Sequence, residues 1–345
     1  MGYILARVWA ESRQRKLLLV GLALFVLVGN YVTAVALGAL DALQSGEGVS
    51  RALLFPSLLQ LAMLGSVPIV VGSLLLEARL MGWERSSLNK LFQAKTRSIR
   101  SDLWYAALYC SHLKILLGIV MSLGIGYYCR ALILTHFDFA LLQDVSLLPM
   151  LVLQFLVGSF MLYVWHRIAH TRFFWEFHKV HHTGEDMTMV NNLRDHPVLD
   201  VGRIAFETLP AAVLGVPPVV LIAYAAVAGT LSLWFHSDFD WRMPFIERYV
   251  LIGARAHRIH HSPLPRHHHT NFGWLVLWER LFGTFCEDPG EIRMGLEDPG
   301  FNRRGTFTEM WVATWVGFRT LLLELVALVR FAAASGGRVM TRVRQ

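Results

Sequence analysis

The sequence predicts an all-α integral membrane protein with about four transmembrane helices, a re-entrant or hairpin helical element and a cytoplasmic histidine-rich helical cap. Apolar residues make up 54% of the 345-residue chain and charged residues only 17%, against about 25% charged residues in ordinary globular proteins. Of the 15 histidines, 13 lie between His166 and His269. This composition excludes a disordered chain and argues against a fully soluble enzyme.

The charge balance and the cysteines narrow the class further. The net charge is +7, with 27 arginines and 5 lysines, and the arginines flank the apolar stretches. We interpret them as membrane topology signals, and we expect no nucleic-acid partner. The three cysteines, Cys110, Cys129 and Cys286, are odd in number and form no C-x-x-C motif, so neither a disulfide framework nor an iron–sulfur or zinc ribbon site is expected.

Four apolar stretches are long enough to cross a bilayer, which needs about 20 residues. They cover residues 17–40, 52–76, 103–129 and 145–165, and the third contains one charge, Lys114. The N-terminus and the loop 77–102 are rich in Arg and Lys, and basic loops stay in the cytoplasm. We therefore expect a multi-pass protein of a bacterial inner membrane, with everything after residue 165 on the cytoplasmic side.

Two later apolar stretches are expected to behave differently. Residues 209–235 carry no charge but contain Pro217 and Pro218, and such prolines break a helix. Because a single crossing would separate the histidines on its two sides, we interpret this stretch as a hairpin or re-entrant element. Residues 311–334 contain three charges and favour an interfacial amphipathic helix, followed by a basic tail.

Three histidine motifs follow the fourth predicted span. An H-x-x-x-H motif places two imidazoles on one face of a helix, and two H-x-x-H-H motifs repeat a second spacing. With one isolated histidine they give nine candidate metal ligands: His166, His170, His178, His181, His182, His236, His257, His260 and His261. A zinc site uses four ligands, so nine histidines suit two ions. Imidazole binds Fe, Zn, Cu and Ni, and the ligand type alone does not choose among them.

The motifs between His166 and Phe285 resemble the fatty acid hydroxylase/sterol desaturase superfamily of membrane di-iron oxygenases. The resemblance includes H-R-x-x-H at His166, H-x-x-H-H at His178, H-R-x-H-H at His257, N-F-G at Asn271 and W-E-R-L-F-G-T at Trp278. It implies two Fe²⁺ ions held by the nine histidines, O2 as co-substrate, and hydroxylation or desaturation of a membrane lipid. No bound flavin, haem or nucleotide is expected.

Further polar residues in the motif segments are expected to orient the imidazoles from a second layer. They are Asp195, His196, Asp238, Asp240, His269, Asn271 and Glu279. An ordinary structural, capping or surface role is the alternative for each of them. Glu279 stands where the family more often has Asp, which keeps the negative charge. The sequence assigns no catalytic residue beyond the proposed ligands.

The resulting hypothesis is an O2-dependent di-iron lipid hydroxylase that receives electrons from an external ferredoxin-type or cytochrome-type system. A sterol-type desaturase with the same ligands is the nearest alternative, and a divalent-metal transporter is a remote one. We divide the chain into an N-terminal membrane region (1–144), a di-iron catalytic domain (145–290) and a C-terminal interfacial helix with a basic tail (291–345).

Overall fold

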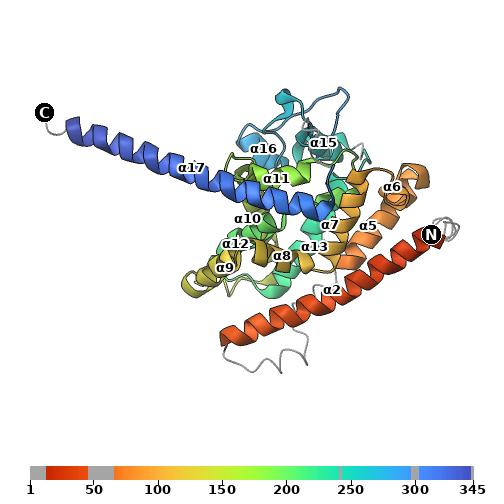
Figure 1. Cartoon of the computed structure of the whole chain (residues 1–345), viewed down its shortest axis with the longest axis horizontal. Helices are drawn as coiled ribbons and strands as arrows, with labels where there is room; N and C mark the ends of the chain where they lie inside the picture. The colour runs from red at the N-terminus through yellow and green to blue at the C-terminus, as the bar shows by residue number, and fades with distance from the viewer. Residues whose placement is uncertain (1–12, 46–65, 241–242, 297–302, 343–345) are drawn as a thin grey trace.

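A computed structural model describes residues 13–45, 66–240, 243–296 and 303–342, and within these ranges all regular elements are helical (Figure 1). The α-helices are α2 (Arg13–Ser45), α5 (Ser66–Met81), α6 (Ser87–Gln93), α7 (Arg97–Cys110), α8 (Leu113–Met121), α9 (Ile125–His136), α10 (Leu147–Ala169), α11 (Trp175–His182), α12 (Pro197–Leu214), α13 (Pro218–Phe235), α14 (Pro244–Tyr249), α15 (Ala254–His260), α16 (Val276–Leu281) and α17 (Thr306–Arg342). Short 3-10 helices cover Trp83–Arg85 (η1), Met189–Leu193 (η2) and Pro265–His267 (η3). The all-helical class is therefore confirmed.

Among the described residues, three helices are long and apolar enough to cross a membrane: α10, α13 and the part of α17 up to Phe331. The bent pair α7 and α8 gives a fourth if it is counted as one span. The predicted span 17–40 lies within α2, whose apolar part is Val20–Ala36. Residues 52–65 of the second predicted span lie outside the described residues, and the remainder of that span belongs to α5.

The third predicted span, residues 103–129, is not one continuous helix. Helix α7 ends at Cys110 and α8 follows after a 95° bend, and α9 is a third separate helix. His112 at the bend has a φ of 57°, a left-handed conformation that an α-helix does not contain. Its Nδ1 lies 2.7 Å from Asn30 Oδ1 of α2, so this histidine is a satisfied polar group between helices.

The apolar stretch 209–235 is not one helix: it is interrupted next to Pro217 and Pro218, as the sequence predicts. Helix α12 ends at Leu214 and is capped by Gly215, which has a φ of 72°; Pro217 precedes α13, which begins at Pro218. Just before α12, Asp195 Oδ1 lies 3.3 Å from His181 Nδ1. Just after α13, His236 Nε2 lies 3.2 Å from His181 Nε2. The two helices thus lead away from His181 and return to it, as the hairpin interpretation requires.

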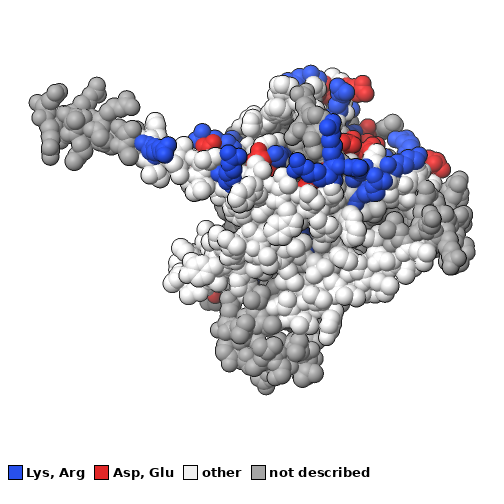
Figure 2. All heavy atoms as spheres, in the orientation of Figure 1, with Lys and Arg blue, Asp and Glu red and all other residues white. Residues whose placement is uncertain are grey.

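Helix α17 leaves the body of the molecule as a long arm (Figure 1). Figure 2 shows a row of basic side chains along it, above a lower body that is almost free of charge. By length and composition α17 also qualifies as a span, so its interfacial position remains a prediction. Its first half packs on α11, where a Cβ at Gly317 would lie 2.5 Å from Phe177 Cζ. Only glycine permits this close approach, and α11 is the helix that carries the second histidine motif.

Candidate metal centre

The nine histidines predicted as ligands lie together in two groups. In each group the potential ligand nitrogens are all within 4.8 Å of one another. Cluster 1 consists of His166, His170, His178, His182 and His260, and cluster 2 consists of His181, His236, His257 and His261. The clusters are adjacent, because the ring centroids of His182 and His261 are 4.5 Å apart.

The two H-x-x-H-H motifs contribute to the clusters crosswise. On α11, His178 and His182 share a helix face and join cluster 1, while His181 points to cluster 2. At α15 the assignment is reversed: His257 and His261 join cluster 2, and His260 joins cluster 1. An i, i+4 pair faces one point, and the intervening position diverges from it. Two identical motifs on two facing helices therefore build two neighbouring sites.

The tautomers of the imidazoles test whether a cation fits. His166 Nδ1 and His260 Nδ1 each lie 2.6 Å from a backbone carbonyl oxygen, of Phe272 and Thr270. A carbonyl only accepts, so both Nδ1 atoms carry the proton and both Nε2 atoms of the neutral rings are lone-pair acceptors. These two Nε2 atoms nevertheless face each other at 3.0 Å. Two lone pairs repel at this distance, whereas a cation between them would bind both.

The spacing within both clusters agrees with this fit. Nε2–Nε2 distances between neighbouring rings run from 3.0 to 3.2 Å. Two nitrogens at right angles, each about 2.1 Å from one ion, are about 3.0 Å apart. An all-imidazole donor set of this kind suits a divalent first-row transition metal.

Burial keeps the candidate ligand imidazoles in the neutral form, which is the form that binds a metal ion. Desolvation lowers the pKa of His236 to about 4, and it holds the pKa of His178 and His260 well below the ordinary 6.5. Because the folded-state pKa values are depressed, the rings stay neutral as the pH falls through 6.5. We expect metal content measured after dialysis to be unchanged at about pH 6 and to fall only well below it. Half-release of the metal near pH 6.5 would contradict this expectation.

The loop between η3 and α16 supplies the carbonyl groups that orient two ligands. Thr270 O fixes His260 and Phe272 O fixes His166. Between them, Asn271 is fully buried with a φ of 53°, a conformation that Asn tolerates better than most residues. Its Nδ2 donates to Ala256 O and Cys286 O, both at 2.9 Å, and its Oδ1 accepts from Cys286 N. Asn271 therefore ties the loop to the start of the third motif.

Glu279 holds the same loop from the other side. Its buried carboxylate accepts from Gly273 N and from Thr284 Oγ1, both at 2.5 Å. Desolvation raises the Glu279 pKa, and these hydrogen bonds counteract it. Both residues act on the imidazoles through the backbone carbonyl groups rather than by direct contact.

We expect Asn271→Ala and Glu279→Ala to weaken metal binding by about 10–100-fold, the usual cost of losing an outer-shell partner. Competition with a chelator of known affinity measures this change. Asp288→Ala is the comparison variant, because Asp288 lies in the neighbouring segment but pairs with Arg266 and His267 instead of the loop carbonyls. Equal metal affinity in Glu279→Ala and wild type would contradict the orienting role.

The other residues that the sequence predicts to orient imidazoles lie in different surroundings from Asn271 and Glu279. Asp195 Oδ1 lies 3.3 Å from His181 Nδ1, as expected of an outer-shell carboxylate, although without hydrogen-bond alignment. Exposed His269 has its ring centroid 6.3 Å from that of His170. Asp238 and Asp240 lie beside Arg258 and not beside an imidazole. Arg258 attracts them because it is a mostly buried cation within the third motif.

His196 also supports the fold rather than a ligand. Its Nδ1 accepts from Val198 N at the start of α12, and its Nε2 lies 3.0 Å from Met310 O of α17. Both ring nitrogens are thus engaged away from the clusters. These contacts favour the structural alternative for His196, which joins α12 to α17.

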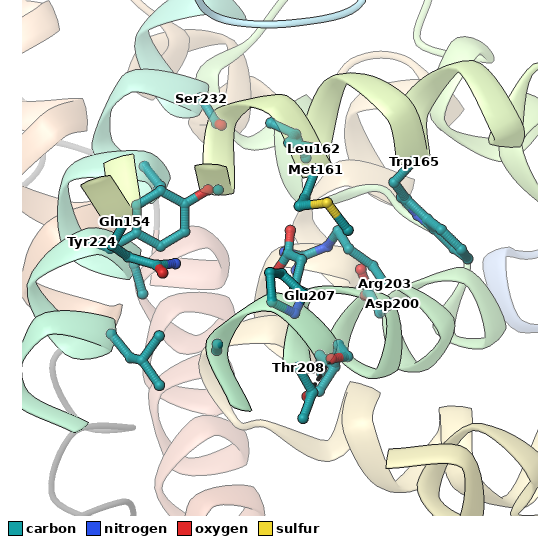
Figure 3. A pocket seen from close by; sticks show the side chains of 18 of the residues that line it. Gln154, Met161, Leu162, Trp165, Asp200, Arg203, Glu207, Thr208, Tyr224 and Ser232 are labelled. Atoms are coloured by element: carbon teal, nitrogen blue, oxygen red, sulfur yellow. Dashed lines mark hydrogen bonds and ion pairs between the residues drawn. The ribbon is translucent and has the colours of Figure 1, made fainter. Parts of the chain in front are cut away.

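Sequence reasoning missed the backbone acceptors and a cavity. Backbone carbonyls carry no sequence signature, although the N-F-G motif marks the loop that holds two of them. A cavity of about 800 Å³ begins at His166, His178, His181, His236 and His257 and extends between α10, α12 and α13 (Figure 3). It reaches the turn at Gly215–Pro218. Helix α12, along which the cavity runs, is roughly 27 Å long at about 1.5 Å per residue.

A comparison of the sequence with known protein families indicates which family the histidine-rich region resembles. The fatty acid hydroxylase family model matches residues 151–284, the part of the chain that contains all nine histidines and the N-F-G loop. Residues 151–284 are therefore similar to the fatty acid hydroxylase family. The predicted resemblance is thereby confirmed.

Named proteins are similar to part of this chain. Ornithine lipid hydroxylase OlsE of Rhizobium tropici is 34% identical over 140 residues, which cover 40% of this chain and 42% of that protein. Alkylglycerol monooxygenase of Danio rerio is 32% identical over 158 residues (45% and 34%), and the Homo sapiens protein is 29% identical over 147 residues (42% and 32%). The chain spans less than half the length of these relatives. No solved structure matches it significantly.

Proposed function

We propose that the protein is an O2-dependent di-iron hydroxylase of a membrane lipid. The observation that carries the proposal is the junction of two all-histidine clusters with a long cavity inside a fatty acid hydroxylase domain. The relatives support the same reaction, because their names describe a lipid hydroxylase and a monooxygenase.

The proposed reaction converts R–H, O2, two electrons and two protons into R–OH and water. Iron bound by the two clusters would supply the activation of O2. The protein itself holds the imidazoles neutral and fixed through Phe272 O, Thr270 O and Ser232 O. The cavity orients the lipid and excludes water from the histidines. The two electrons come from an external donor, for which we propose a ferredoxin-type or cytochrome-type system.

The placement in the membrane is part of the proposal. Helices α11 and α15, which carry much of the two clusters, lie in the upper part of Figure 1, on the side where charged side chains gather in Figure 2. This arrangement supports a multi-pass inner-membrane protein whose clusters face the cytoplasm, as the basic loops indicate. It also supports a catalytic domain over 145–290, between the N-terminal membrane region and the C-terminal helix.

Lipid analysis of a host that expresses the protein tests the reaction. We expect a lipid that is heavier by one oxygen atom, and we expect it to be missing when His178→Ala replaces the wild type. A product lighter by two hydrogens would support the desaturase alternative instead. Unchanged lipids together with metal uptake would overturn the proposal in favour of a transporter.

A further inference from the structure

Charged side chains line the part of the cavity that lies between α12 and the apolar helices α10 and α13. One stripe of α12 contributes Asp200, Arg203 and Glu207 in alternating sign, at a spacing that puts them on one face of the helix. Figure 3 shows this stripe on one side of the cavity, and Gln154 and Tyr224 on the other. Charges in such a region are expensive, and they are usually retained for function.

Four of the charged groups that line the cavity form two neutral pairs. Lys114 Nζ lies 2.7 Å from Asp200 Oδ2, and both side chains are largely buried. Arg203 Nη1 lies 3.1 Å from one Glu207 oxygen and 3.3 Å from the other. Each pair offers a cation and an anion to the cavity, so together they match a ligand that carries one charge of each sign.

Gln154 gives an independent indication of a polar ligand. Its side chain is 5% exposed, and its Oε1 has no hydrogen-bond partner among the described residues. A buried acceptor without a partner costs about 1–3 kcal/mol. It lines the same cavity as the charged stripe, where a donor such as an ammonium group would satisfy it.

The order of the lining residues along α12 orients the ligand. Asp200, Arg203 and Glu207 occupy the part of α12 that follows the histidine clusters, whereas the small apolar residues Ala211 and Ala212 lie further along α12, before the turn at Gly215–Pro218. A polar headgroup therefore belongs next to the clusters and the apolar chains toward the turn. The oxidised C–H bond is then close to the headgroup.

We propose that the α12 stripe and Gln154 form the binding subsite for a zwitterionic lipid headgroup that contains an ammonium group and a carboxylate or phosphate. Asp200, Glu207 and Gln154 receive the ammonium group, and Lys114 and Arg203 receive the anionic group. This inference rests on the proposed lipid substrate, but not on turnover. An amino-acid headgroup and a phosphoethanolamine headgroup share this chemistry.

Lipid retention by the full-length, metal-free protein tests the subsite. The protein is equilibrated with mixed micelles of an ornithine lipid, phosphatidylethanolamine, phosphatidylglycerol and diacylglycerol of equal chain length, and retained lipid is quantified by mass spectrometry. We expect one or both zwitterionic lipids to be retained about tenfold over the anionic and neutral lipids. If the protein retains more of the ornithine lipid, the anionic group of the ligand is a carboxylate, and if it retains more phosphatidylethanolamine, the anionic group is a phosphate. Equal retention of diacylglycerol would overturn the proposal.

A charge exchange separates recognition from structure. Glu207→Gln removes one anion, and Arg203→Glu with Glu207→Arg preserves the helical ion pair but reverses its polarity along the cavity. We expect both proteins to lose the preference by about tenfold, while Arg100→Gln, an exposed charge on α7, keeps it. Unchanged preference in the exchanged protein would reduce the pair to a structural role and overturn the inference.

The two proposals fail in different ways. Zwitterionic selectivity without any oxygenated product would contradict the hydroxylase and leave the subsite intact. Oxygenation of diacylglycerol as fast as of zwitterionic lipids would leave the hydroxylase intact and overturn the subsite.

Discussion

Alanine at His260 and alanine at His181 will each remove one metal ion, because the two side chains belong to different clusters. Each variant has one cluster with one imidazole fewer. It therefore no longer holds the two ions that the proposed reaction needs. We expect lipid hydroxylation to fall by more than the roughly 10–100-fold that loss of an outer-shell partner causes. Metal analysis of the purified variants measures the first effect, and product formation measures the second.

His136→Ala is the matched control for these variants. His136 is an exposed histidine at the end of α9, outside both clusters, so its replacement leaves metal content and activity unchanged. Full metal content in either cluster variant would contradict the assignment of ligands. Retained activity in a protein that holds a single ion would contradict the need for two.

Arg194→Met is expected to cause the largest loss of stability. Arg194 and Asp102 are 1% and 0% exposed, and Arg194 Nη1 lies 3.1 Å from Asp102 Oδ1. This ion pair fixes the segment around η2 to α7. Removing the cation leaves a buried carboxylate without its partner, at a cost of about 3–5 kcal/mol. We expect the thermal midpoint in detergent to fall by roughly 10 °C.

Two further variants test the cause of this loss. Arg194→Met combined with Asp102→Leu removes both charges and recovers most of the stability, because an apolar pair replaces the ion pair. Arg100→Met changes an exposed arginine on α7, the helix that carries Asp102, and leaves the thermal midpoint unchanged. A double variant as unstable as Arg194→Met would show that packing, and not the unpaired charge, sets the cost.

The histidines were the most predictable part of the site. An i, i+4 spacing fixes a shared helix face whatever the tertiary structure, so His178 with His182 and His257 with His261 could be paired from the sequence. The assignment of His181 and His260 to opposite clusters could not, because it depends on how α11 and α15 face each other. The prolines at 217 and 218 likewise predicted the hairpin, since they act locally.

Features that depend on tertiary contacts were less predictable. The bend at His112 has no proline, and only the structure shows its left-handed backbone. Asp238 and Asp240 lie in a motif segment, yet the nearby cation Arg258 determines their position. The stripe of Asp200, Arg203 and Glu207 is visible in the sequence, but only the packing of α10, α12 and α13 makes it the wall of a cavity.

Turnover of the iron-loaded protein under ¹⁸O₂ tests the central claim most directly. The full-length protein, supplied with a chemical reductant and host lipid, should contain two irons per chain and yield a lipid with one ¹⁸O atom in a new hydroxyl group. Glu279→Ala should lower this yield in proportion to its lost iron. A protein that binds no iron, or an iron-loaded protein whose lipid product carries oxygen from water alone, would contradict the account.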